Sequence, residues 1–72
     1  MWKALGNALR RERERCGLSV REIERRSGVA FRTMYDYENA TKEGGINLKK
    51  YVAICDAIGC DPCKLLAEAM KR

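Results

Sequence analysis

The feature that most constrains the fold is a series of helix start and stop signals at short intervals along the 72-residue chain. Between these signals, apolar residues recur at helical spacing throughout. The interruptions are Gly17, Ser27-Gly28, Gly44-Gly45 and Gly59. A chain of this size can bury only one small core. We therefore predict an all-α fold of five short helices in a single domain that spans residues 1–72.

The first predicted helix covers residues 2–16 and brings an arginine onto its buried face. Its expected inner residues are Trp2, Leu5, Leu9 and Cys16. The same stripe reaches Arg13, which needs a carboxylate partner because an unpaired buried charge is very costly. Glu38 lies four residues after the apolar Met34 and shares the buried face of the third predicted helix. We therefore predict an Arg13–Glu38 ion pair that joins the two helices.

The second and third predicted helices are short and closely spaced. Residues 19–26 begin with Ser19 and Glu22, the pattern of a capping box. Gly28 then supplies a turn residue that can adopt a positive φ, and a third helix follows over about Ala30 to Asn39. The expected inner residues of this pair are Val20, Ile23, Val29, Met34 and Tyr37.

Two further helices are predicted after the Gly44-Gly45 loop. Asn47 caps the fourth, which ends at Gly59, and Asp61-Pro62 opens the fifth in the order that helix starts prefer. Their expected inner residues are Leu48, Tyr51, Val52, Cys55, Ile58, Leu65, Leu66, Ala69 and Met70.

The net charge of +5 is concentrated at one end of the sequence. Residues 1–32 contain nine basic and four acidic groups, whereas residues 33–72 contain six of each. The first 32 residues therefore carry the whole excess. A one-sided positive field of this kind suits a polyanion such as duplex nucleic acid.

Several classes of protein are excluded or disfavoured. The chain has no histidine, which rules out His-based catalytic triads and His₂Cys₂ zinc fingers. No other catalytic constellation is evident, so we expect no enzymatic activity. No run approaches the roughly 18 apolar residues of a membrane span, and residues 1–5 lack the apolar region of a signal peptide. We therefore expect a cytoplasmic protein with reduced thiols and no membrane contact.

The four cysteines allow two interpretations. Cys60 and Cys63 form a Cys-x-x-Cys, which together with Cys16 and Cys55 could make a Cys₄ zinc site or a redox sensor. The favoured interpretation is that Cys55 and Cys60 pack in the core as small apolar residues. We expect no metal, no cofactor and no small-molecule ligand.

Two short helices joined by a glycine turn, in a basic all-helical domain, form an architecture that reads the major groove of DNA. Residues 18–39, with the turn Gly28-Val29 and the pair Glu38-Asn39, resemble the Cro/CI-type (XRE-like) helix-turn-helix repressors of bacteria and phages. Residues 57–62, Ala-Ile-Gly-Cys-Asp-Pro, are similar to a segment common near the end of these domains. The resemblance implies a five-helix, lambda-repressor-like domain that binds double-stranded DNA in a bacterial or phage-infected cell.

The resemblance also implies roles for individual residues. The candidates for base contacts are Phe31, Arg32, Tyr35 and Asp36. The candidates for phosphate contacts are Val20, Arg21, Thr33, Asn39 and Lys42. The pair Arg13 and Glu38 matches a structural ion pair of phage-repressor relatives.

Three positions depart from the family pattern. Val20 stands where a glutamine is usual, so only its backbone N–H can serve a phosphate. Glu24 stands where the two helices cross closely and alanine is usual, so its side chain must swing outward or open the crossing. Ala30 replaces the usual Ser or Thr cap, which weakens the start of the third helix by roughly 1 kcal/mol.

The function predicted from the sequence is that of a transcriptional regulator, and specifically a repressor, whose third helix enters the major groove. Such a small domain gains affinity as a homodimer on a palindromic site, and the surface expected for this contact carries Leu66, Ala69 and Met70. The alternative is a protein-interaction module, such as an antitoxin or regulator subunit, with weak or no DNA binding. The acidic Asp36 and Glu24 favour this alternative mildly.

Overall fold

The computed structural model describes residues 2–40 and 45–71, and within these ranges it contains five helices and no strand. The helices are α1 (Trp2–Arg15), α2 (Val20–Ser27), α3 (Phe31–Asn39), α4 (Leu48–Ile58) and α5 (Pro62–Met70). The predicted all-α, five-helix fold is confirmed. Lys42, a predicted phosphate contact, lies outside the described residues.

Local capping explains why three of the helices begin where they do. The Ser19 hydroxyl accepts the amide of Glu22 and the Glu22 carboxylate accepts the amide of Ser19, which completes the predicted capping box of α2. Asn47 caps α4 by accepting the amide of Lys50, and Asp61 caps α5. These three predicted helix starts are confirmed.

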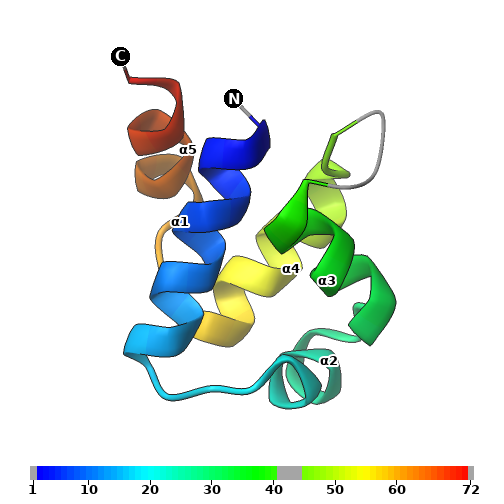
Figure 1. Cartoon of the computed structure of the whole chain (residues 1–72). Coiled ribbons are helices and arrows are strands. Elements are labelled where there is room, and N and C mark those ends of the chain that lie inside the picture. Colours follow the sequence, from blue (N-terminus) through cyan, green and yellow to red (C-terminus); the bar gives the residue numbers. More distant parts are fainter. Residues whose placement is uncertain (1, 41–44, 72) are drawn as a thin grey trace.

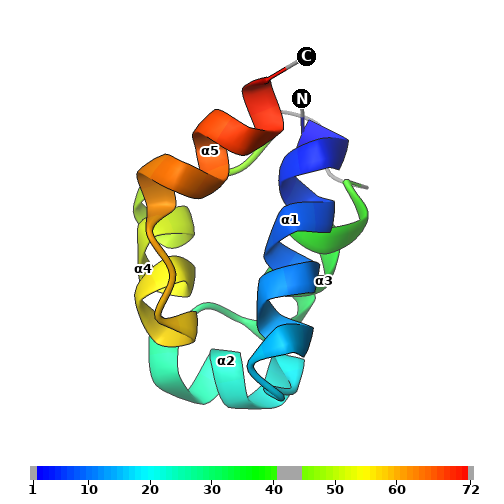
Figure 2. The ribbon, with the colours of Figure 1, turned by 90° about the vertical axis from the view of Figure 1, so that its left-hand side faces the viewer.

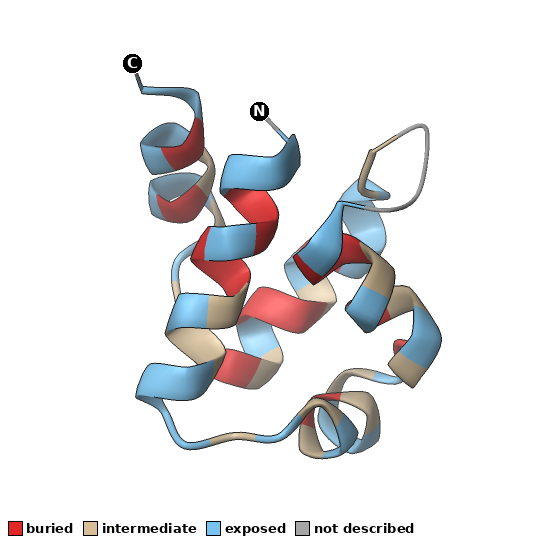
Figure 3. Cartoon of the chain, viewed as in Figure 1, coloured by how far each residue is buried: buried red, intermediate tan, exposed pale blue. Residues whose placement is uncertain are grey.

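The helices surround one core. α1 packs against α3 and α5, whereas α2 packs against α3 and α4 (Figures 1 and 2). Figure 3 shows the buried residues on the faces that the helices turn toward one another. The largest fully buried side chains are Leu5, Leu9, Ile23, Met34, Ile54 and Cys55.

Two residues expected on the inner face of α1 are exposed. The helix ends at Arg15, because Gly17 adopts a φ of 72° and the amide of Leu18 bonds to the carbonyl of Arg13. Cys16 therefore lies in the turn, outside the stripe. Trp2 is 42% exposed because it lies in the first turn, where its ring covers Gly45 at the edge of the core.

The inner face of α4 is also rotated from the prediction. Leu48 is 71% exposed and Val52 is partly exposed, whereas Ile54, which the sequence pattern missed, is completely buried. The buried stripe is Tyr51, Ile54, Cys55 and Ile58, a regular i, i+3, i+4, i+7 series. Leu48 lies one turn before this stripe, at the start of the helix. Met70, at the end of α5, is likewise exposed.

α1 and α3 approach each other closely at Gly6. A Cβ atom at this position would lie 2.9 Å from the carbonyl oxygen of Glu38 and closer still to that of Tyr37. The buried glycine therefore lets the backbone of α1 contact the last turn of α3. This contact determines where the end of α3 lies.

Candidate nucleic-acid interface

The turn between α2 and α3 is built by three consecutive residues. The Ser27 hydroxyl donates to the carbonyl of Ile23 at 2.6 Å and accepts the amide of Val29 at 3.0 Å. Gly28 adopts a φ of 78°, the left-handed conformation predicted for this turn residue. Val29 is buried and packs the turn against the core. The result is a helix-turn-helix in which the orientation of α3 is tied to α2.

α3 has one buried face and one face open to solvent. Met34, Tyr37 and Glu38 are buried, whereas Arg32 and Tyr35 are exposed. Arg32 approaches the Asp36 carboxylate at 3.9 Å, one helical turn along the open face. The open face of α3 therefore presents a guanidinium, a phenol and a carboxylate, groups that can form hydrogen bonds with base edges.

The buried face of α3 ends in the ion pair that the sequence predicted. Arg13 Nε donates to Glu38 Oε2 at 2.7 Å, and Arg13 Nη2 donates to Glu38 Oε1 at 3.0 Å. A third donor, Nη1, bonds to the carbonyl of Leu18 at 2.9 Å. Glu38 is only 4% exposed, and its hydrogen bonds raise the pKa of Arg13. This bidentate pair joins α1 to the end of α3.

A second arginine of α1 contacts the last residue of α3, which the sequence did not reveal. Arg10 Nη2 donates to Asn39 Oδ1 at 2.8 Å, and Arg10 Nε lies 3.5 Å from Glu38 Oε1. The Asn39 amide group also donates to the carbonyl of Tyr35 at 2.9 Å. The side chain of Asn39, a predicted phosphate contact, is thus used within the protein.

The start of α3 has no cap of its own. Ala30 stands at the N-cap position and provides no side-chain hydrogen bond. Instead, Oε2 of Glu24, from α2, accepts the backbone amide of Phe31 at 3.2 Å. The Glu24 side chain is 37% exposed. It spans the crossing and bonds the first residue of α3.

Arg21 completes a cluster at this crossing, which we call the Arg21–Glu24–Phe31 cluster. The Arg21 guanidinium carbon lies 4.4 Å from the centre of the Phe31 ring, within the range of a cation–π contact. Arg21 Nη1 also lies 3.6 Å from Glu24 Oε1. The side chain of Arg21 remains 72% exposed, so it faces solvent while contacting both neighbours.

The remaining predicted phosphate contacts differ in accessibility. Val20 packs partly against the core, which leaves its backbone amide at the start of α2 as the group able to meet an anion. Thr33 is half-buried on the flank of α3. The exposed Lys49 and Lys50 follow the N-cap of α4 and add positive charge there.

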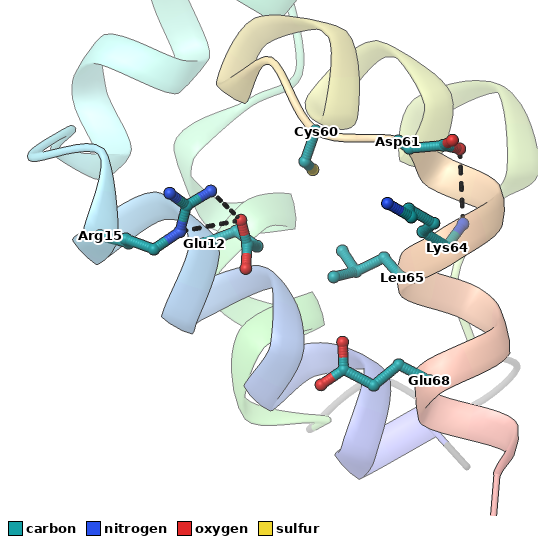
Figure 4. A pocket seen from close by; sticks show the side chains of 7 residues that line it. All are labelled: Glu12, Arg15, Cys60, Asp61, Lys64, Leu65 and Glu68. Atoms are coloured by element: carbon teal, nitrogen blue, oxygen red, sulfur yellow. Dashed lines mark hydrogen bonds and ion pairs between the residues drawn. The ribbon is translucent and has the colours of Figure 1, made fainter.

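Two of the basic residues of α1, Arg11 and Arg15, are paired on the side of the molecule that faces α5. Arg15 hydrogen-bonds to Glu12 and lowers the pKa of that carboxyl, and Arg11 pairs with Glu68 of α5 at 2.8 Å. Figure 4 shows a pocket between α1 and α5 that is lined mostly by charged residues, with the Arg15–Glu12 bonds at one side. Part of the positive excess of the first 32 residues is therefore neutralised away from α2 and α3.

The cysteines lie around the α4–α5 connection. Cys55 is completely buried, and this burial raises the pKa of its thiol to about 12. Cys60 packs partly against the core, whereas Cys16 and Cys63 are exposed. The predicted core role of Cys55 is confirmed. Within the described ranges, no three Cys, Asp or Glu side chains are grouped so that they could hold a metal ion.

Comparison with known proteins agrees with this geometry. Residues 4–67 match the family described as the helix-turn-helix domain. The chain belongs to the helix-turn-helix domain family. This helix-turn-helix family is related to the XRE type that the sequence resembles.

A solved relative covers nearly the same length. The crystal structure of the clp gene regulator ClgR from C. glutamicum is 31% identical, with a TM-score of 0.81 over 93% of this helix-turn-helix chain and 84% of the ClgR chain. A search of curated proteins gave no significant match. None of the described helices is long and apolar enough to cross a membrane.

Proposed function

We propose that this helix-turn-helix protein is a sequence-specific, double-stranded DNA-binding transcription regulator that acts as a repressor in the bacterial cytoplasm. The observation that carries the proposal is the division of α3 into a buried face and an open polar face, next to the basic α2. This is the arrangement by which a recognition helix enters the major groove while its other side stays in the core. The solved relative is named a gene regulator, which supports the same role.

In this proposal, α3 reads bases through its open face. Arg32 is suited to donate two hydrogen bonds to a guanine edge, and Tyr35 offers a hydroxyl to a base or phosphate. Asp36 accepts a hydrogen bond from a cytosine amino group and orients Arg32, which lies 3.9 Å away. Phe31 was also predicted to face bases, but Arg21 covers its ring, and its role is treated in the next subsection.

Phosphate contacts then lie on both sides of α3. The backbone amide of Val20 and the guanidinium of Arg21 bind one strand at the start of α2, where the helix dipole favours an anion. Thr33, Asn39 and Lys42 contact the backbone along and after α3. To bind a phosphate, Asn39 gives up its hydrogen bond to Arg10, and the Arg10 guanidinium then contacts the same phosphate.

We further propose a homodimer on a palindromic site, with half-sites about 34 Å apart. The exposed Met70 and the partly buried Leu66 line an apolar groove of about 250 Å³ together with Trp2 and Leu48. Ala69 was expected on this surface, but it is buried within its own domain. Two copies joined through the groove would cover side chains that are costly to leave in water.

The decisive experiment selects bound sequences from a random duplex library with the purified protein. We expect an enriched palindrome and an affinity that falls steeply with salt, because phosphate contacts release counterions. Arg32→Ala should relax selection at one base pair per half-site and weaken binding by about 1–3 kcal/mol. The matched control is Arg25→Ala, an exposed arginine of α2.

Absence of binding even at low salt would overturn the proposal and favour the protein-interaction module instead. Binding with a normal salt dependence but no enriched sequence would retain a DNA partner and remove the specific role of α3. The oligomeric state, measured with and without DNA, tests the dimer separately.

A further inference from the structure

The start of α3 is the least usual part of the helix-turn-helix. A helix begins with amide groups that have no partner inside the helix, and a side chain at the N-cap normally accepts one of them. Ala30 has no polar side chain, although its backbone has the extended ψ of 143° that a capping residue adopts. Ala30 therefore has the backbone conformation of an N-cap residue but no side-chain acceptor.

Glu24 provides the missing acceptor from another helix. Its Oε2 atom accepts the Phe31 amide at 3.2 Å, seven residues away in sequence and across the turn. A carboxylate at this point also faces the positive end of the α3 dipole, which favours it over a neutral side chain. Glu24, at the helix crossing, thus supplies the hydrogen-bond acceptor that Ala30 lacks at the N-cap position.

The same carboxylate lies beside Arg21. Its other oxygen is 3.6 Å from Arg21 Nη1, while the guanidinium stacks over the Phe31 ring at 4.4 Å. A long, largely exposed arginine normally samples many rotamers and loses that freedom when it binds. Two contacts from different helices restrict Arg21 before any ligand arrives, which is preorganisation.

We propose that Glu24 and Phe31 are positioning residues of the interface: Glu24 replaces the N-cap of α3, and the Phe31 ring supports Arg21 in the orientation that binds a DNA phosphate. The first part concerns the protein alone, and the second rests on the proposed DNA-binding function. In this arrangement Phe31 acts through Arg21 and does not read a base. Glu24 connects the phosphate contact on α2 to the start of the recognition helix.

The first test needs no DNA. Glu24→Ala should speed hydrogen exchange of the amides of the first turn of α3 about fivefold and lower the unfolding midpoint. Adding Ala30→Ser to this variant should restore the midpoint and slow the exchange of the Arg32 or Thr33 amide, because the new hydroxyl accepts one of them. Glu14→Ala, at an exposed position of α1, is the control.

If Glu24→Ala leaves exchange in the first turn of α3 unchanged, Glu24 does not cap the helix. If Ala30→Ser fails to rescue the double variant while it stabilises the unmodified protein, the two residues are not interchangeable. Either result would overturn the first part.

The second test is a double-mutant cycle of Arg21→Ala and Phe31→Leu, measured as affinity for the selected duplex at several salt concentrations. Leucine keeps an apolar side chain at the half-buried position but removes the aromatic face. We expect Arg21→Ala to lower the salt slope by about 1. Phe31→Leu should weaken binding in the presence of Arg21 and have little further effect in its absence.

Additive losses, or a changed preference at a single base pair in Phe31→Leu with an unchanged salt slope, would show that Phe31 reads DNA directly. If the unmodified protein binds no DNA, the proposed function and the role of Arg21 fail together. The exchange measurements still decide the role of Glu24 in that case.

Discussion

α2 and α3 are adjacent helices of similar length, yet they are held in different ways. α2 carries its own capping box at Ser19 and ends at Gly28, which adopts the left-handed conformation without strain. α3 has alanine at both ends, and Ala40 adopts a φ of 53° that is unfavourable for a residue with a Cβ atom. Glu24 of α2 bonds the first residue of α3, and Arg13 and Arg10 of α1 bond its last two residues.

The difference teaches that α3 depends on contacts from neighbouring helices more than α2 does. Glu24 bonds the first residue of α3, whereas Arg13 and Arg10 bond its last two residues, Glu38 and Asn39. Because these contacts come from outside, they determine the orientation of α3 as well as its stability. The proposed entry of α3 into the major groove gains precision from such contacts.

The largest expected effect comes from breaking the buried contact at the end of α3. Glu38→Ala leaves the Arg13 guanidinium in a site that is largely shielded from water, and we expect a loss of about 3–5 kcal/mol in unfolding free energy. Glu68→Ala removes an exposed α1–α5 ion pair of similar length, and its cost should be below about 1 kcal/mol. Denaturant unfolding measures both, and equal losses would contradict this distinction.

A methyl group at Gly6 should push α3 away from α1. We expect Gly6→Ala to cost about 1–3 kcal/mol, although alanine is the better helix former, because the new Cβ would meet the carbonyl groups of Tyr37 and Glu38. Asn7→Ala, at the next and exposed position, is the control. If Gly6→Ala instead stabilises the protein, the helices do not cross as closely as described.

Loss of the α2 cap should lower the unfolding free energy less than the changes above, and its effect should be confined to the start of α2. Ser19→Ala removes one half of the capping box and should cost about 1 kcal/mol. Amide exchange should accelerate in the first turn of α2 and stay unchanged in the last turn of α3, which Arg13 holds. Faster exchange at Tyr37 and Glu38 would show that α3 depends on the α2 cap as well.

The smallest effect is expected at the end of α3. Ala40→Gly relieves the left-handed conformation and should stabilise the protein by up to about 1 kcal/mol, reduced by the greater chain entropy of glycine in the unfolded state. Gly28→Ala, the matched reverse change at the end of α2, should destabilise it. Thermal unfolding of the two variants compares the helix ends directly, and a loss of stability in Ala40→Gly would refute the strain.

The predictable part of the site followed from spacing within single helices. Residue type and position predict Ser19 with Glu22, Asn47 and Asp61 as caps, since a cap bonds an amide only two or three residues away, as each does here. The Arg13–Glu38 pair was also predictable, since both residues interrupt an apolar stripe and each needs the other. Leu48 and Val52 were assigned wrongly because the stripe has two possible alignments in a short, mostly apolar helix.

The cluster at the start of α3 could not have been found in this way. Ala30 signals a weak cap, but no local rule assigns the compensation to Glu24, whose two predicted alternatives were to swing outward or to open the crossing. The observed bond depends on how α2 packs against α3, which brings the carboxylate to the Phe31 amide. The Arg10–Asn39 bond likewise depends on how closely α1 and α3 approach at Gly6.

The amino-acid sequence alone specified the number of helices, the ends of α2 and the need for a buried ion pair, because these depend on contacts a few residues apart or on unpaired charge. The folded arrangement settled which polar groups hold α3 and which remain exposed on its open face. The physical reason is range: a cap acts within one turn, whereas the contacts of Glu24 and Arg10 depend on where another helix has packed.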